Sequence, residues 1–526
     1  MRRLGPNDKI AVIGAGIGGL SAALLLASAG RDVVLIEAAD GPGGKLRTVP
    51  SAAGPVDAGP TVLTLLPVFE ALFEAAGEDL HDHLSVRREP LLARHWWPDN
   101  STLDLHADGE ASAAAVRAFA GPKAEGEFRA FHRDAARLFR AFEAPVMQAA
   151  RPDLAGILMA CLRNPRIIPS LAPPRTLWAA LAQRFTDKRL AQLFARYATY
   201  VGGSPFDSPA LLSLIWSAEA AGVWTIEGGM AKLAHAIEHL LRRRGIEIRY
   251  STPVSTIQRK ADRFDIHCAD GTHHDAAQVV FNGDPAALTG GLLGPNLCAA
   301  VRPAGVTPRS LSAYVWAFAA KPEGRDLAHH NVFFNTDYRT EFDAIDAGRV
   351  PDDAALYVCA QDRGAGPMVH GLERFEIILN GAPTHGGQSP DPQEFETCLT
   401  RTFETLSRRG LSFDPVPGRA GLTTPRDFSE RFPGSAGSLY GLSPHGTMAS
   451  FNRPVVRSRI PGLYLAGGGV HPGAGLPMAA TSGRLAAEAI LKDLASTSRS
   501  RRMAMRGGTS TDYLKTAPAV SRSSPS

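Results

Sequence analysis

The 526-residue sequence has only five cysteines, and no two of them lie within a few residues of each other. They are Cys161, Cys268, Cys298, Cys359 and Cys398. An odd number at such wide spacing argues against a disulfide framework and against a zinc site, and it favours a reducing compartment. We therefore expect no metal ion and interpret the cysteines as inert thiols.

Long apolar runs and targeting segments are also missing. No stretch reaches the ~18 apolar residues that a membrane-spanning helix needs, and the opening residues MRRLGPND do not resemble a signal peptide. No Ser/His/Asp set and no metal-ligand spacing is present, which argues against hydrolases and metalloenzymes. The composition, 44% hydrophobic and 21% charged, is that of a globular protein of two or three domains.

The net charge is only +4, but it is unevenly distributed. Residues 151–200 hold eight bases and two acids, interleaved with Leu, Ile, Trp and Phe. A second basic segment follows residue 495 and is rich in Ser, Thr, Arg and Pro, which predicts a disordered tail at 495–526. The pattern at 151–200 indicates a surface that contacts membrane lipids rather than nucleic acid, although an ordinary solvated helix face would have the same composition.

The first motif is a glycine-rich turn within a β-α-β pattern. The run Gly14-Ala15-Gly16-Ile17-Gly18-Gly19 lies between a predicted strand at 9–13 and a predicted helix at 17–29, and Glu37 ends a second strand at 33–36. Such a turn lets the backbone and the helix N-terminus approach a pyrophosphate, while the terminal acid accepts hydrogen bonds from ribose hydroxyls. The pattern therefore predicts a dinucleotide site.

Two further motifs distinguish FAD from NAD. Gly41 to Thr48 contains Gly44 and Lys45, and it is followed by Val56-Asp57-Ala58-Gly59-Pro60-Thr61. An extended FAD needs such additional backbone beside its pyrophosphate and ribityl chain. Near the other end of the chain, a strand at 463–466 leads into glycines and a helix that begins near Pro477, whose N-terminus would favour the negative charge of a reduced flavin. These motifs predict FAD as the cofactor.

The order of the segments predicts a sheet built from both ends of the chain. Strands near 246–282 and 463–466 can complete the sheet of the opening β-α-β pattern, with the central helical block as an insertion. We therefore assign 1–110, 240–300 and 455–494 to a discontinuous FAD-binding domain. We assign 111–240 to a helical substrate and membrane-facing region, and 300–455 to a substrate domain.

Together these motifs resemble the FAD-containing amine oxidase superfamily and, within it, the bacterial phytoene-type carotenoid desaturases. The resemblance rests on VIGAGIGGLSAA at 12–23, PGGK at 42–45, VDAGPTVLT at 56–64, VVFNGDP at 279–285 and LYLAGGGVHPGAGLP at 463–477. The segments at 91–105, 200–212 and 221–230 are similar to the 1-hydroxycarotenoid 3,4-desaturases, also called methoxyneurosporene dehydrogenases. Val56 replaces an aromatic residue usual in phytoene desaturases, which also favours this branch.

The resemblance implies an α/β fold with a Rossmann-like FAD-binding domain of the amine oxidase type. It also assigns cofactor contacts to Val254, Asn282, Asp284, Gly468, Gly475, Leu476, Pro477 and Met478, in addition to the residues of the earlier motifs. Lys45 stands where many relatives have arginine, so a point charge replaces a planar fork. No catalytic base is identified. His471 lies near the expected flavin end, and we interpret it as fixing the loop.

The implied reaction is C-3,4 desaturation of an acyclic carotenoid with a 1-hydroxy or 1-methoxy end. Alternatives are a phytoene desaturase, a carotenoid isomerase or oxygenase, and a non-catalytic carotenoid carrier. A lipid-soluble substrate and the absence of a spanning segment predict peripheral attachment to the cytoplasmic face of the inner membrane. A tertiary hydroxyl also needs a polar partner in the substrate tunnel, and the hairpin around 96–101 is the first candidate.

Overall fold

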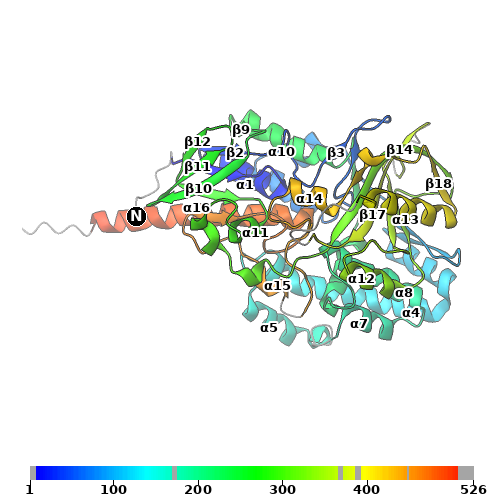
Figure 1. Ribbon diagram of the computed structural model, residues 1–526. Coiled ribbons are helices and arrows are strands. Elements are labelled where there is room, and N and C mark those ends of the chain that lie inside the picture. The colour runs from blue at the N-terminus through cyan, green and yellow to red at the C-terminus, as the bar shows by residue number, and fades with distance from the viewer. Residues whose placement is uncertain (1–7, 169–174, 365–370, 385–391, 447–448, 507–526) are drawn as a thin grey trace, which may run out of the picture.

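The computed structural model describes residues 8–168, 175–364, 371–384, 392–446 and 449–506. They form three parts: a parallel sheet with its helices, a larger mixed sheet, and a helical region (Figure 1).

The parallel sheet has the strand order β20-β13-β1-β2-β9. Its strands are β1 (Ile10–Ile13), β2 (Val33–Ile36), β9 (Glu247–Arg249), β13 (Gln278–Phe281) and β20 (Leu463–Leu465). All pairs are parallel, so strands from the beginning, middle and end of the chain meet in one sheet. This confirms the predicted assembly from distant segments.

Helices α1 (Ile17–Ser28), α10 (Ala231–Arg243) and α16 (Leu476–Arg506) pack around this sheet. Helix α1 is apolar on nearly every side because it lies between the sheet, α10 and α16. A Cβ atom on Gly483 would lie 2.1 Å from the Gly18 carbonyl oxygen, so α1 and α16 approach backbone to backbone. The first motif and the C-terminal helix are thereby held together.

Smaller elements pack around the two sheets. They are an antiparallel sheet of β10 (Val254–Lys260), β11 (Arg263–Cys268) and β12 (His273–Ala276), the ribbons β3 (Thr48–Val49) with β4 (Val56–Asp57) and β5 (Val86–Arg88) with β8 (Trp224–Ile226), the helices α2 (Pro67–Ala75), α3 (Leu80–His83), α11 (Pro285–Thr289) and α15 (Ala449–Asn452), and the helical turns η5 (Pro295–Ala300) and η6 (Pro303–Gly305).

The mixed sheet has the order β18-β14-β17-β16-β15-β6-β7, with β19 beside β14. Its strands are β6 (Leu91–Trp96), β7 (Thr102–His106), β14 (Ser312–Gly324), β15 (His330–Phe333), β16 (Leu356–Ala360), β17 (Glu373–Gly381), β18 (Leu411–Asp414) and β19 (Leu422–Thr423). Helix α13 (Glu394–Arg408) covers one face, where Trp316 and Phe318 are buried. Alternate residues such as Val315 therefore point to the opposite face. Helices α12 (Tyr338–Asp346) and α14 (Pro425–Arg431) and the turn η7 (Arg419–Gly421) complete this part.

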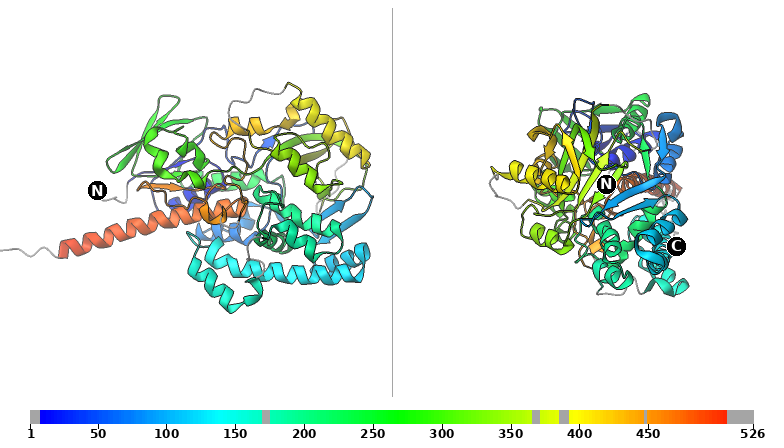
Figure 2. Two further views of the ribbon diagram at one scale, coloured as in Figure 1. Left: turned by 60° about the horizontal axis from the view of Figure 1, so that its bottom comes forward. Right: turned by 90° about the vertical axis from the view of Figure 1, so that its right-hand side faces the viewer.

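The helical region lies below both sheets in Figure 1 and along the lower edge of the left view in Figure 2. It consists of α4 (Gly109–Phe142), η1 (Glu143–Met147), α5 (Leu154–Arg163), η2 (Pro165–Ile167), α7 (Leu177–Arg184), α8 (Lys188–Ala195), η3 (Arg196–Val201), η4 (Ala210–Leu214) and α9 (Ile215–Ala220). In none of the described ranges is there a helix with the length and apolarity to cross a membrane.

Two predicted domain boundaries need correction. The hairpin at 91–106 forms as expected, but β6 pairs in parallel with β15, so the hairpin belongs to the mixed sheet and not to the cofactor domain. Helix α10 buries Leu233, Ile237 and Leu241 in the same core as β1, so the helical region ends before β8. Periodicity reveals that a segment is a hairpin or a helix, but not which distant sheet it packs against.

The start of the predicted tail also needs correction. Helix α16 continues to Arg506, whereas the sequence predicts a disordered tail from 495. Residues 495–506 contain neither proline nor glycine, and Arg, Met and Ala favour helix, so nothing ends the helix before Gly507. Residues 507–526 lie outside the described ranges.

Candidate cofactor and substrate site

A cavity of about 1710 Å³ runs from the parallel sheet to the mixed sheet. Typical small-molecule pockets have about 300–1,000 Å³. This cavity therefore has room for a cofactor and a second, elongated ligand. The predicted cofactor residues that line it are Gly14, Gly16, Ile17, Gly18, Glu37, Gly44, Lys45, Pro60, Thr61, Val254, Asn282, Asp284, Gly468, Gly475, Leu476 and Pro477.

Ala15, Gly19 and Met478 are not part of the cavity lining. The Ala15 N–H donates to the Glu37 carboxylate at 2.5 Å, and a Cβ atom on Gly19 would lie 2.0 Å from the Gly14 carbonyl oxygen. Ala15 and Gly19 therefore stabilise the conformation of the turn without facing the cavity. Met478 is half-buried in the first turn of α16.

Glu37 lies where β2 ends and lines the cavity. Its carboxylate accepts the backbone N–H groups of Ala15 and Ala39, at 2.5 and 2.8 Å. A carboxylate has about four lone-pair sites, so it retains acceptor capacity for ligand hydroxyls. The Thr252 N–H donates to the Glu37 carbonyl oxygen at 2.9 Å, which brings the segment leading to Val254 beside the same acid.

The second glycine loop contacts the first directly. The Gly43 N–H donates to the Ala15 carbonyl oxygen at 2.9 Å, and a Cβ atom on Gly44 would lie 3.2 Å from the Gly16 Cα. Lys45 then reaches across the cavity, where its Nζ donates to the Leu439 carbonyl oxygen at 2.5 Å. Burial, with the nearby charges of Arg309 and Arg453, lowers the pKa of Lys45 to about 8, although Asp284 opposes the shift.

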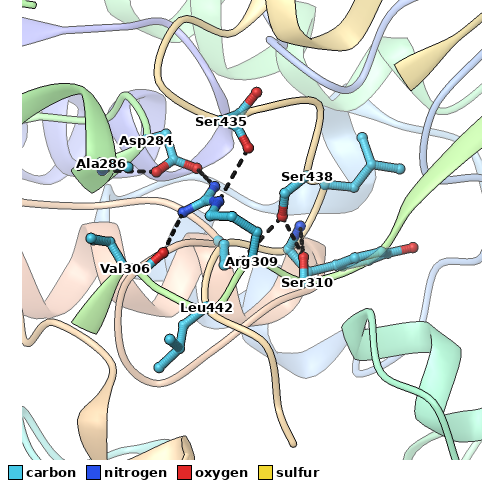
Figure 3. Close-up of polar contacts among 12 residues, drawn as sticks. Asp284, Ala286, Val306, Arg309, Ser310, Ser435, Ser438 and Leu442 are labelled. Carbon is cyan, nitrogen blue, oxygen red and sulfur yellow. Dashed lines mark hydrogen bonds and ion pairs between the residues drawn. The ribbon is translucent and has the colours of Figure 1, made fainter. Parts of the chain in front are cut away.

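The glycine loops and Glu37 form one wall of the cavity, called here the cofactor wall. Asp284 connects this wall, through Arg309, to the loop at 435–442 (Figure 3). Its carboxylate accepts the Ala286 N–H at 2.9 Å, which caps α11, and it forms a buried ion pair with Arg309. Arg309 also donates to the carbonyl oxygens of Ser435 and Val306, both at 3.1 Å. Next to this pair, the hydroxyls of Ser310 and Ser438 lie 2.5 Å apart.

The C-terminal glycine loop is held by contacts on both sides. The Gly467 N–H donates to Ser482 Oγ at 2.7 Å, and Arg453 donates to the Gly468 carbonyl oxygen at 2.9 Å. His471 is buried outside the cavity lining, and its Nε2 lies 3.0 Å from the Ala149 carbonyl oxygen. This contact agrees with the interpretation that His471 fixes the loop.

These residues fit FAD. The first glycine turn presents the N-terminus of α1, whose initial N–H groups have no partners within the helix and favour an anion. Lys45, Arg309 and Arg453 place three buried cations beside the single carboxylate of Asp284. The resulting excess of positive charge suits a diphosphate or an anionic flavin.

No motif in the sequence indicates the polar side chains on the wall of the cavity that faces the glycine loops. Thr61 was expected only as a cofactor residue, yet its hydroxyl lies 2.9 Å from Tyr357 Oη and donates to Glu376 at 3.1 Å. Arg196 and Tyr200 line the cavity as well. These polar residues come from strands and turns that are far apart in sequence. Only the folded arrangement brings them together, so no local motif indicates them.

The hairpin was the wrong candidate for an end-group partner. No residue from 96 to 101 is part of the cavity lining. Trp97 is buried in the core instead, where it packs against Phe334 and donates to Gln192 at 3.1 Å. Trp97 therefore belongs to a hydrophobic core between the hairpin and the helical region.

Known proteins resemble this chain in both sequence and fold. Residues 17–308 and 388–491 match the family described as flavin containing amine oxidoreductase. A hydroxyneurosporene desaturase of Cereibacter sphaeroides is 55% identical, covering 95% of this chain and 100% of that protein. One from Rhodobacter capsulatus is 50% identical, covering 92% and 98%.

A solved structure gives the same fold at low identity. Cyclohexylamine oxidase from Brevibacterium oxydans superposes with a TM-score of 0.57 at 17% identity, covering 93% of this chain and 100% of that one. The family match includes the second glycine loop and the glycine loop before α16, which both line the cavity. The chain therefore belongs to the flavin containing amine oxidoreductase family, and FAD is its cofactor.

Proposed function

We propose that this protein is an FAD-dependent desaturase that introduces a C-3,4 double bond into acyclic carotenoids with a 1-hydroxy or 1-methoxy end. The observation that carries the proposal is the large cavity, which joins the glycine-rich cofactor wall to an apolar face of the mixed sheet. The identities of 55% and 50% to hydroxyneurosporene desaturases support it.

The chemistry follows from the two walls of the cavity. Desaturation removes a hydride and a proton from adjacent carbons; FAD, when bound, would supply the acceptor for the hydride, and the proton would pass to a base. Val315, Val332 and Ile378 provide an apolar surface that orients a polyene and excludes water. The glycine turns, Glu37 and Lys45 hold the cofactor against this surface.

The main alternatives differ in substrate or product. A phytoene desaturase would convert phytoene faster, an isomerase would leave the mass unchanged, and an oxygenase would add oxygen. The test is competition in one extract between phytoene and 1-hydroxyneurosporene, followed by mass analysis. We expect the hydroxylated substrate to lose two hydrogens first, and faster conversion of phytoene would reject the proposal.

The pKa of Lys45 predicts a pH dependence of FAD binding. Because burial lowers this pKa to about 8, the charge that attracts a phosphate is present at pH 7 and is lost as the pH rises through about 8. One charge-assisted hydrogen bond contributes about 1.5–3 kcal/mol. We expect the dissociation constant for FAD, measured by flavin fluorescence, to rise up to about tenfold between about pH 7 and 9.

Two variants separate this charge from general effects of pH. Lys45→Met should weaken binding at neutral pH and remove the dependence. Lys321→Met, which changes an exposed lysine on β14, should retain the wild-type profile. An unchanged pH profile in Lys45→Met would show that another group titrates.

We also propose that the protein attaches peripherally to the cytoplasmic face of the inner membrane through α5. Leu154, Leu158 and Leu162 recur along one side of this helix and are 65%, 62% and 67% exposed. Ile157 and Cys161 on the other side pack against the core. Exposed Arg163 ends the helix, and exposed Arg151 and Arg166 flank it. A contiguous apolar stripe beside bases suits an anionic lipid surface.

Replacing the three exposed leucines of α5 by serine should release the protein from vesicles containing phosphatidylglycerol. A buried leucine contributes about 1.5–3 kcal/mol, and even partial insertion of three should change the partition coefficient by roughly tenfold or more. Cosedimentation at low salt measures this. Val416→Ser alters an exposed apolar residue on another part of the surface and should bind like wild type. Equal binding by the triple variant would remove α5 as the contact.

A further inference from the structure

The cavity face of the mixed sheet carries one straight row of side chains across four strands. The register places Val315 opposite Ile378, Ile378 opposite Tyr357, and Tyr357 opposite Val332. All four residues line the cavity. Three are aliphatic, so the hydroxyl of Tyr357 is a single polar group in an otherwise apolar row.

This hydroxyl is held by a buried polar cluster. Tyr357 Oη lies 2.9 Å from Thr61 Oγ1 and 2.7 Å from His330 Nδ1, and Thr61 donates to Glu376 at 3.1 Å. Burial, with the charges of His329 and Arg196, keeps the pKa of His330 well below its usual value. In the tautomer protonated at Nε2, neutral His330 accepts the proton of Tyr357 at Nδ1, and the oxygen of Tyr357 then retains a lone pair for an incoming donor.

Arg196 supplies donors in the same part of the cavity. Its side chain lines the cavity although the residue is only 6% exposed. Nη2 donates to Tyr200 Oη at 2.9 Å, and Tyr200 donates in turn to Glu219 at 2.8 Å. For Nε and Nη1 the described ranges contain no hydrogen-bond partner. Burying a guanidinium whose N–H donors have no partner costs free energy, and a ligand oxygen that accepts from these donors would offset that cost.

We propose that Tyr357 and Arg196 bind the oxygen at C-1 of the substrate. This inference rests on the proposed function. A hydroxyl at C-1 accepts from Arg196 and donates to Tyr357, whereas a methoxy group only accepts. C-1 is two bonds from C-3, so its oxygen binds next to the reacting carbons. Thr61 fits this placement, because it contacts Tyr357 and lies in the second cofactor motif.

The experiment compares purified holoenzyme variants on three acyclic carotenoids that carry a hydroxyl, a methoxy group or no oxygen at C-1. Tyr357→Phe removes the acceptor and should lower kcat/KM for the hydroxylated substrate by about ten- to a hundredfold, with the other two substrates nearly unaffected. Tyr314→Phe is the matched control, because Tyr314 lies on the opposite face of the same sheet and packs in the core beneath α13.

A second variant tests the donor. Arg196→Met combined with Glu219→Gln removes the charge without leaving its counter-charge buried, and Glu219→Gln alone is the control. The pair should lose conversion of both oxygenated substrates by about tenfold or more relative to the control, while the substrate without oxygen is converted at least as well. Flavin content and melting temperature, measured on every variant, separate loss of selectivity from loss of fold.

The outcomes distinguish this inference from the proposed function. If wild type converts the hydroxylated carotenoid and Tyr357→Phe loses activity equally on all three substrates, or on none, the end-group site is rejected while the desaturase proposal stands. If wild type converts none of the three, the proposed function itself fails. The site is supported if Tyr357→Phe loses activity only on the hydroxylated substrate and the Arg196 variant loses activity on both oxygenated substrates.

Discussion

Gly16→Val is expected to abolish FAD binding. Gly16 lines the cavity between β1 and α1, and a Cβ atom there would already lie 2.9 Å from Asn282 Nδ2. Valine adds two further methyl groups at the N-terminus of α1, where a diphosphate would approach the backbone. Loss of even two hydrogen bonds to a charged group, at about 1.5–3 kcal/mol each, weakens binding by more than about a hundredfold.

Flavin absorbance per protein after reconstitution and dialysis measures this loss. Gly126→Val provides the control, because Gly126 is exposed in α4 with open space around its Cβ position, and it should bind FAD like wild type. Full flavin occupancy in Gly16→Val would show that the diphosphate does not approach this turn.

Asp284→Ala is expected to destabilise the protein by about 3–5 kcal/mol, the usual cost of removing one partner from a buried ion pair. The side chains of Arg309 and Asp284 are 12% and 7% exposed, and Asp284 also caps α11 (Figure 3). Alanine would leave Arg309 buried without its counter-charge, close to Lys45 and Arg453. The free energy of unfolding of the apoprotein in urea measures the effect.

The control for Asp284→Ala is an exposed ion pair. Arg339 and Asp343 in α12 form an i,i+4 pair whose side chains are 61% and 56% exposed. Asp343→Ala should therefore change stability by no more than about 0.5 kcal/mol. Similar losses in the two variants would mean that the Asp284 pair is not a special connection between the cofactor wall and the loop at 435–442.

The cofactor wall could be predicted because its signals are local. The turn from Gly14 to Gly19, Glu37 at the end of β2, and the glycines before α16 each lie within one short stretch of sequence. Each stretch determines its own backbone geometry. Much of the parallel sheet also followed from local signals, since β1, β2 and β13 are short, apolar runs.

The wall of the cavity formed by the mixed sheet could not be predicted, because it depends on sheet register. Tyr357, Ile378 and Val315 become neighbours only when three antiparallel strands align, and a shift of one residue would turn each to the other face. Arg196 joins them from a helical turn far away in sequence. The hairpin at 96–101 was the first candidate for the end-group partner, yet tertiary packing buries Trp97 in the core.

The most direct test of the account is a single turnover of the holoprotein with 1-hydroxyneurosporene in the absence of oxygen. We expect the absorbance of oxidised flavin to disappear as the carotenoid loses two hydrogens, with one new C-3,4 double bond per flavin reduced. The same mixture with phytoene should leave the flavin oxidised for longer. Flavin that stays oxidised with the hydroxylated carotenoid, or that is reduced faster by phytoene, would contradict the account.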